Sequence, residues 1–255
     1  MKFLMITDIE GIVGVDKFYQ VRTTDNTVKG PAMKQLAREV NAAIRGIHSI
    51  YPEADVYVWD GHGSGGLYKE DIMNGHYLRE GKPYFNLLDY AAVLFVGQHA
   101  MAGTISAPLC HTYSSLHIAY YKLNGIFIGE FGARALVAGS QGVPTVYLSG
   151  DDKAALEAKM FIPEIVTTVV KHGKEIEKAV HLGKEVVYQS IQHDVATAVK
   201  RLDIIPPFTN IKPPYTLEIR YYQPQEKEKH HSENVTWIDS HTVLIEATDL
   251  NRLPI

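Results

Sequence analysis

Apolar runs of strand length alternate with helical patterns over roughly the first 160 residues of the chain. The runs are nearly continuous, which is typical of strands covered on both faces. Their alternation with helices indicates βαβ units around a parallel sheet. The expected strands are residues 2–7, 54–59, 91–97, 125–129 and 144–149.

Helices are expected between and after these strands. Apolar residues recur every three or four positions between residues 31 and 50, which predicts an amphipathic helix there. The patterns after Glu130, from about 151 to 160, and from 184 to 202 also favour helices. The pattern of residues 162–175 is ambiguous between helix and strand.

The texture of the chain changes after about residue 160. Residues 204–215 form a proline-rich connector, and residues 216–222 and 241–249 look like strands on either side of a charged loop at 226–234. We therefore expect an α/β fold with a mostly parallel sheet and helices on both faces over residues 1–165. A smaller α+β domain is expected over residues 166–255.

Composition excludes several classes of protein. The 255 residues carry a net charge of −4, and 45% are hydrophobic, which is typical of a soluble globular protein and offers no footprint for nucleic acid or an anionic membrane. The single cysteine, Cys110, excludes an internal disulfide, and no apolar stretch approaches the ~20 residues of a membrane span. We expect a cytoplasmic protein.

Acids and histidines follow the expected strands of the first half. Loops beyond the carboxyl ends of parallel strands gather at one edge of the sheet, where ligands bind. Each of four strands delivers chemistry-capable residues to that edge, namely Asp8 and Glu10, Asp60 and His62, His99 with His111 shortly after it, and Glu130. Any one of these alone would be read as a cap or a turn residue, but glycines flank nearly every member and allow close approach.

Asp8 and Glu10 pose the sharpest question, because side chains two apart on a strand share a face and like charges repel. One or two divalent ions between them would resolve it. Carboxylates and imidazoles suit Zn, Mn, Co or Ni, and five ligands favour a pair of ions over a single one.

Other motifs carry weaker interpretations. GHGSGG at 61–66 fits a dinucleotide loop by letters, but no helix opens directly after it and it does not lie in the first βα unit. Cys110 beside His111 is a possible nucleophile but more simply a small buried residue. The remaining histidines considered, His172, His181, His193, His230, His231 and His241, are expected to fill the core or face solvent.

Five motifs occur in an order that resembles the bacterial D-aminopeptidase family encoded in dipeptide-transport operons, a group of metallopeptidases. They are TDIEG, WDGHGS, VGQHA, CHTYS and GEFGARALVAG, and they fall within residues 1–165, with a thinner likeness to the C-terminus. The segment between His99 and His111 looks one residue longer than in the family and differs in composition, which concerns substrate choice.

The resemblance implies a zinc aminopeptidase with two ions per subunit, acting on short peptides or amino-acid amides, and a homo-oligomer built as a ring of ten. It implies that Asp8 bridges the ions, and that His111 is catalytic without being a ligand. The other implied ligands are Glu10 and His62 for one ion, and His99 and Glu130 for the other; Asp60 is implied to orient His62. The second domain is then expected to serve oligomerisation and to shape the pocket.

Three alternatives stay open. The same ions could serve an amidase or esterase acting on another small acyl substrate. A phosphate-releasing hydrolase is less favoured, because the motif loops lack Lys and Arg, although Arg134 lies near Glu130. A non-catalytic metal-binding assembly protein would hold metal without activity.

Overall fold

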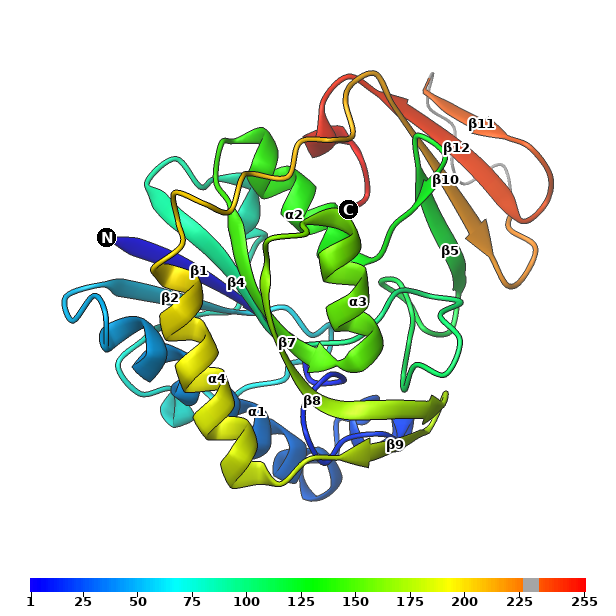
Figure 1. The fold of residues 1–255 in the computed structure, drawn as a ribbon. Coiled ribbons are helices and arrows are strands. Elements are labelled where there is room, and N and C mark those ends of the chain that lie inside the picture. Colours follow the sequence, from blue (N-terminus) through cyan, green and yellow to red (C-terminus); the bar gives the residue numbers. More distant parts are fainter. Residues whose placement is uncertain (227–233) are drawn as a thin grey trace.

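The computed structural model describes residues 1–226 and 234–255 and is built on a large sheet of seven strands (Figure 1). In spatial order the strands are β3 (His76–Leu78), β2 (Asp55–Asp60), β1 (Lys2–Thr7), β4 (Tyr90–Gln98), β7 (Thr145–Asp151), β8 (Val166–Glu175) and β9 (Lys178–His181). All neighbours pair in parallel except β8 and β9. The central strands are buried on both sides, as their continuous apolar runs predicted.

Helices cover both faces of this sheet. The helices α1 (Asn26–His48) and α4 (Lys184–Val199) pack against each other on one face. The helices α2 (Glu130–Ser140) and α3 (Asp152–Phe161) lie together on the other. Opposite faces are the expected result, because the chain leaves β1 and β4 in opposite directions and such crossovers are right-handed. The predicted α/β class is confirmed.

A second, antiparallel sheet stands beyond α2 and α3, at the upper right of Figure 1. Its order is β11 (Val235–Trp237), β12 (Thr242–Ala247), β10 (Tyr215–Tyr221), β5 (Ile118–Leu123) and β6 (Ile126–Phe127). The predicted fourth parallel strand at 125–129 is therefore wrong. Asn124 and Gly125 both have positive φ, and this Asn-Gly pair turns the chain from β5 into β6 as a two-residue hairpin.

Both sheets take strands from either side of residue 165. The ambiguous segment 162–175 supplies β8, which extends the large sheet, while β5 and β6 belong to the small one. Sheet membership thus does not follow the expected boundary, and the division into two domains at residue 165 stays a prediction. The expected charged loop at 226–234, with His230 and His231, lies almost wholly outside the described residues.

The order of the strands creates a switch point between β1 and β4, because the chain leaves them toward opposite edges of the sheet. Ligands bind in the crevice at such a point. Two glycines let the loops interlock there. A Cβ on Gly11 would lie 2.1 Å from the Gln98 carbonyl oxygen, and a Cβ on Gly97 would lie 2.1 Å from the carbonyl oxygen of Asp8.

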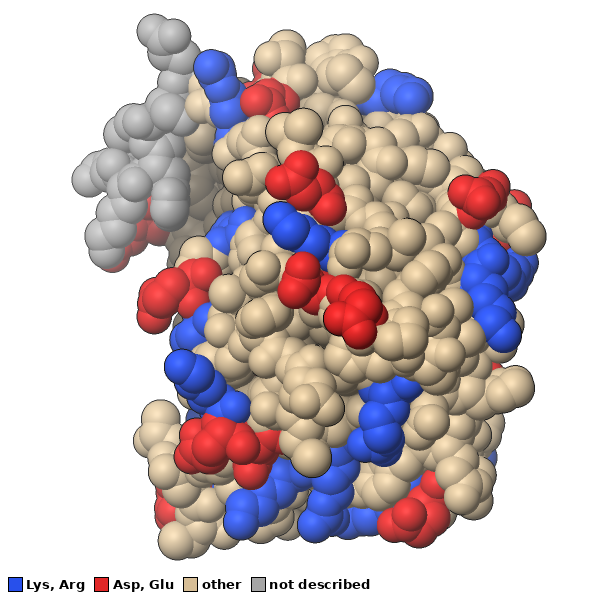
Figure 2. Space-filling view, turned by 90° about the vertical axis from the view of Figure 1, so that its left-hand side faces the viewer, with Lys and Arg blue, Asp and Glu red and all other residues tan. Residues whose placement is uncertain are grey.

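The face shown in Figure 2 carries acidic and basic side chains interspersed, without a large patch of one sign. Within the described ranges, no helix combines the length and the apolar character that crossing a membrane requires.

Candidate metal centre

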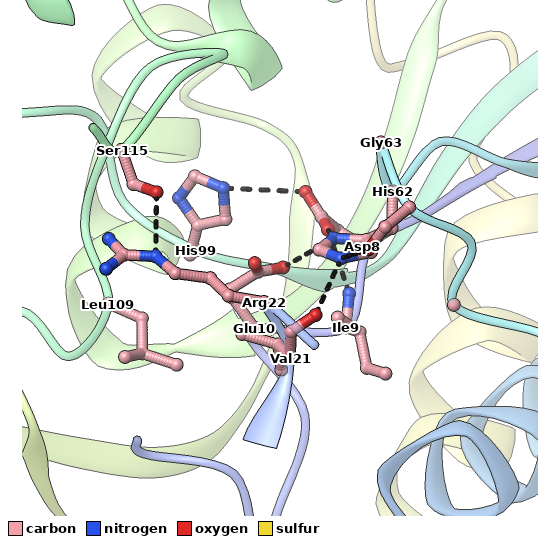
Figure 3. Close-up of polar contacts among 12 residues, drawn as sticks. Asp8, Ile9, Glu10, Val21, Arg22, His62, Gly63, His99, Leu109 and Ser115 are labelled. Atoms are coloured by element: carbon pink, nitrogen blue, oxygen red, sulfur yellow. Dashed lines mark hydrogen bonds and ion pairs between the residues drawn. The ribbon is translucent and has the colours of Figure 1, made fainter. Parts of the chain in front are cut away.

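Asp8 and Glu10 lie in the loop that follows β1, not on the strand itself. The Asp8 amide donates to the Val96 carbonyl (3.0 Å), and the Gly11 amide donates to the Gly97 carbonyl (2.8 Å), so the loop is fastened to β4. Both carboxylates are 3% exposed and point toward the same space (Figure 3). The sequence argument of a shared strand face is therefore wrong in its geometry, although the two acids do converge.

His62 comes from the loop after β2. Its Nδ1 lies 3.3 Å from Asp8 Oδ1 and 3.2 Å from Glu10 Oε2. The Asp60 carboxylate accepts the amides of Gly66 and Leu67, so it shapes the loop and no described contact joins it to the His62 ring. Arg79 completes the loop by donating to the carbonyls of Asp60, His62 and Gly63 at 2.8–2.9 Å.

His99 and His111 stack with ring centres 3.9 Å apart. His99 Nδ1 lies 2.9 Å from the Ala100 carbonyl, and His111 Nδ1 lies 2.8 Å from the Leu109 carbonyl. Because a carbonyl only accepts, both Nδ1 atoms carry the proton. In each ring the Nε2 atom is then left to face the acids.

Glu130 is the first residue of α2. Its carboxylate lies near His99 and His111, whereas His62 lies near Asp8 and Glu10. Its Oε1 lies 3.7 Å from His99 Nε2 and 3.9 Å from His111 Nε2. Its Oε2 accepts from Arg134 at 2.9 Å, and the Tyr113 amide donates to Oε1 at 2.9 Å. Arg134, one helical turn later, therefore orients the carboxylate from behind.

The spacing of these groups fits a metal ion better than direct contact. The inward-facing pairs are 3.2–3.9 Å apart, longer than the ~2.7–2.9 Å of charge-assisted hydrogen bonds. Two ligands at ~2.1 Å on one tetrahedral zinc ion would lie about 3.4 Å from each other. Glu10 Oε2 and His99 Nε2 are buried without a hydrogen bond, which is expected of atoms that serve as metal ligands.

Electrostatics at the centre reflect the same arrangement. Burial alone would raise the pKa of Asp8, but His62 and His99 lower it well below its usual range. Burial lowers the pKa of His62, yet Glu10 and Asp8 raise it to about 10. Burial raises the pKa of Glu130, but Arg134 and His99 lower it to about 2. Asp8 and Glu130 are thus ionised beside a protonated His62, and a divalent ion would supply positive charge in place of that proton.

The structure brings together all six predicted site residues. Ligand atoms of Asp8, Glu10 and His99 lie within 4.8 Å of one another, as do those of His99, His111 and Glu130. His111 is therefore placed where it could also be a ligand, which the sequence did not suggest. The roles of the six residues stay predictions.

The other polar residues considered from the sequence lie elsewhere. The Cys110 thiol donates to the Thr104 carbonyl (3.5 Å), and burial raises its pKa, so it is a poor nucleophile. His172 and His181 pair with Asp152 and Asp16 outside the cluster. His193 lies on α4, and His241 precedes β12 and contacts Ser240.

Two buried residues support the centre and were missed from the sequence. Lys171 on β8 is fully buried and donates to the carbonyls of Glu10 and Val15, which clamps the loop after β1. Glu39 on α1 accepts from the Val13 amide at 2.9 Å and holds the same loop from the other side. Only the unusual burial of a lysine and a glutamate marks them, and burial is invisible in one sequence.

Comparison with known proteins gives three findings. The family model Peptidase_M55, described as D-aminopeptidase, matches residues 1–253. A D-aminopeptidase of Bacillus subtilis (strain 168) is 31% identical over 121 residues, which is 47% of this chain and 43% of that protein. The sequence match thus spans less than half the length of that relative.

The third finding concerns the fold. The structure of the Zn-dependent D-aminopeptidase DppA from Bacillus subtilis, described as a self-compartmentalizing protease, superposes with a TM-score of 0.88 at 24% identity. The superposition covers 98% of this chain and 93% of the other. At that identity the likeness shows a shared fold.

Proposed function

The chain belongs to the D-aminopeptidase family Peptidase_M55, and from this premise we propose that it removes N-terminal amino acids, D-residues included, from short peptides or amides with the help of zinc. One observation carries the proposal. Buried carboxylate and imidazole atoms face one another at 3.2–3.9 Å, a spacing that suits shared metal ions. The described DppA neighbour, which is zinc-dependent, supports the choice of metal.

The proposed centre would hold two zinc ions. Asp8 would serve both, since its two oxygens face His62 on one side and His99 on the other. The remaining ligands are Glu10 and His62 on the first side, and His99 and Glu130 on the second. When bound, such ions polarise a carbonyl and lower the pKa of a coordinated water toward ~7.

His111 is proposed to move a proton during hydrolysis. Its Nδ1 donates to the Leu109 carbonyl, which leaves its Nε2 free. His111 lines the same cavity as Glu10 and Glu130. A base fixed in this way can take a proton from water at Nε2 and deliver it to the leaving amine nitrogen. The Leu109 carbonyl stabilises the imidazolium formed between these two transfers.

Assembly and location are part of the proposal. Residues 166–255 are proposed to build a homo-oligomer, a ring of ten by family resemblance, in the cytoplasm. The description of DppA as self-compartmentalizing supports an oligomer in which the site faces an inner space. Light scattering on the purified protein measures the mass directly, and a monomer at micromolar concentration would contradict this part.

Substrate assays test the proposed function. The zinc-loaded protein is assayed on D-Ala and L-Ala p-nitroanilides, D-Ala dipeptides, N-acetylated dipeptides, simple esters and phosphate monoesters, with and without a chelator. We expect hydrolysis of substrates with a free N-terminus, lost on chelation and restored by zinc. Cleavage of N-acetylated substrates or esters alone would favour the amidase or esterase, and full metal content with no turnover would favour a non-catalytic protein.

A further inference from the structure

The centre opens into a cavity of about 380 Å³ whose charges are unevenly placed. Buried acids lie at its floor, and one exposed arginine, Arg22, lines the same cavity. The other lining arginine, Arg134, is buried and already paired with Glu130. Arg22 is thus the accessible cation of this cavity among the described residues.

The Arg22 side chain is held in place with its fork open. Its Nε donates to Ser115 Oγ at 3.1 Å (Figure 3). Its guanidinium carbon lies 3.4 Å from the centre of the Phe18 ring. In the described parts of the chain, its two terminal nitrogens have no hydrogen-bond partner. A guanidinium whose stem is fixed and whose terminal nitrogens are free is arranged to bind a carboxylate through two parallel hydrogen bonds.

The distance from Arg22 to the centre suits a short peptide. Arg22 and His111 both lie beside the Phe18 ring, whose centre is 3.4 Å from the guanidinium carbon and 6.5 Å from the centre of the His111 ring, so the guanidinium carbon lies within about 10 Å of the His111 ring centre. In a dipeptide the terminal carboxylate lies about 3.8 Å beyond the scissile carbonyl, and each further residue adds about 3.5 Å. A peptide of two or three residues therefore has the reach to contact both His111 and Arg22.

The mouth of the cavity also offers partners to a free peptide carboxylate. Arg22 supplies a positive charge that attracts it. Ser114 and Ser115 line the mouth beside Arg22 and offer hydroxyl donors to the same carboxylate.

We propose that Arg22 binds the C-terminal carboxylate of the substrate and so makes the protein select peptides of two or three residues over amides and longer chains. This inference rests on the proposed aminopeptidase function. It assigns to Arg22 a role in binding and none in bond cleavage, so its removal should act on KM and leave kcat nearly unchanged.

The test compares wild type, Arg22→Gln and Arg22→Lys on D-Ala-D-Ala, its C-terminal amide and D-Ala p-nitroanilide. Arg38→Gln is the matched control, because it removes the same charge from a different surface groove on α1. We expect Arg22→Gln to raise KM for the free dipeptide about tenfold to a hundredfold, with the two uncharged substrates changed less than twofold. Arg22→Lys should fall between, since it keeps the charge without the fork.

Two failures are distinguishable. Suppose that wild type cleaves the substrates, and that Arg22→Gln raises KM equally for the dipeptide and its amide or changes neither KM. The proposed role of Arg22 is then wrong, while the aminopeptidase function stands. If wild type cleaves none of the three with zinc bound, the proposed function is wrong and the inference falls with it.

Discussion

Replacing Lys171 with methionine is expected to destabilise the fold and weaken zinc binding together. The lysine is fully buried, donates to the Glu10 and Val15 carbonyls, and lies near the buried acids Asp151 and Glu39. Burial lowers its pKa to about 8, so it carries its proton at pH 7. Methionine fills a similar volume but leaves two carbonyls and the acids without that cation.

The expected loss follows from this environment. Removing one partner from a buried set of charges costs about 3–5 kcal/mol. The lower end applies here, about 3 kcal/mol, because burial has raised the pKa of Glu39 to about 7 and it can take up a proton when the lysine is gone. Since Lys171 holds the carbonyl of a proposed ligand, zinc affinity should fall about tenfold to a hundredfold.

Urea unfolding of the zinc-free protein measures the first quantity, and competition with a chromogenic chelator measures the second. The matched control is Lys200→Met at the exposed end of α4, which should change the free energy of unfolding by less than about 0.5 kcal/mol. A Lys171→Met protein that loses less than about 1 kcal/mol and binds zinc normally would refute the clamp.

Three further predictions concern single groups. His111→Ala should keep both zinc ions by elemental analysis yet lose about 100-fold or more in kcat, and a drop to one ion would instead make His111 a ligand. Gly11→Ala should destabilise the fold by about 3 kcal/mol in urea titrations, because the new Cβ meets the Gln98 carbonyl. Gly63→Ala, with open space around it, should be nearly neutral, and equal effects of the two substitutions would contradict the interlocked loops. Burial raises the pKa of Glu157 to about 7, so folding favours its protonated form. The free energy of unfolding of wild type should therefore fall by about 3 kcal/mol between pH 4.5 and 7 relative to Glu157→Gln. Parallel pH profiles of the two proteins would show that this carboxyl titrates normally.

The sequence was sufficient for the four central strands β2, β1, β4 and β7, because strands buried on both faces leave continuous apolar runs. Loops after parallel strands must also meet at one edge, which is why Asp8, His62 and His99 could be grouped. Of the small sheet, the sequence predicted the strands β10 and β12. Asn124 and Gly125 form a hairpin turn, and this hairpin places β6 beside β5 in the small sheet rather than in the large one.

The supporting residues could not be read from one sequence, since their roles depend on contacts between distant segments. Lys171 reaches a carbonyl 161 positions earlier in the chain, and Arg22 is held by a serine 93 positions later. No local pattern marks such pairs. Their side chains would ordinarily be assigned to the surface, as most lysines and arginines are.

The proposed function requires the side chains of Asp8, Glu10, His62, His99 and Glu130 to hold a pair of zinc ions together. An anomalous difference map, recorded at the zinc edge from crystals of the zinc-loaded protein, locates the ions without reference to activity. We expect two peaks, one on each side of the Asp8 carboxylate. A map with no peak within reach of Asp8, or with ions held only by residues elsewhere on the chain, would contradict it.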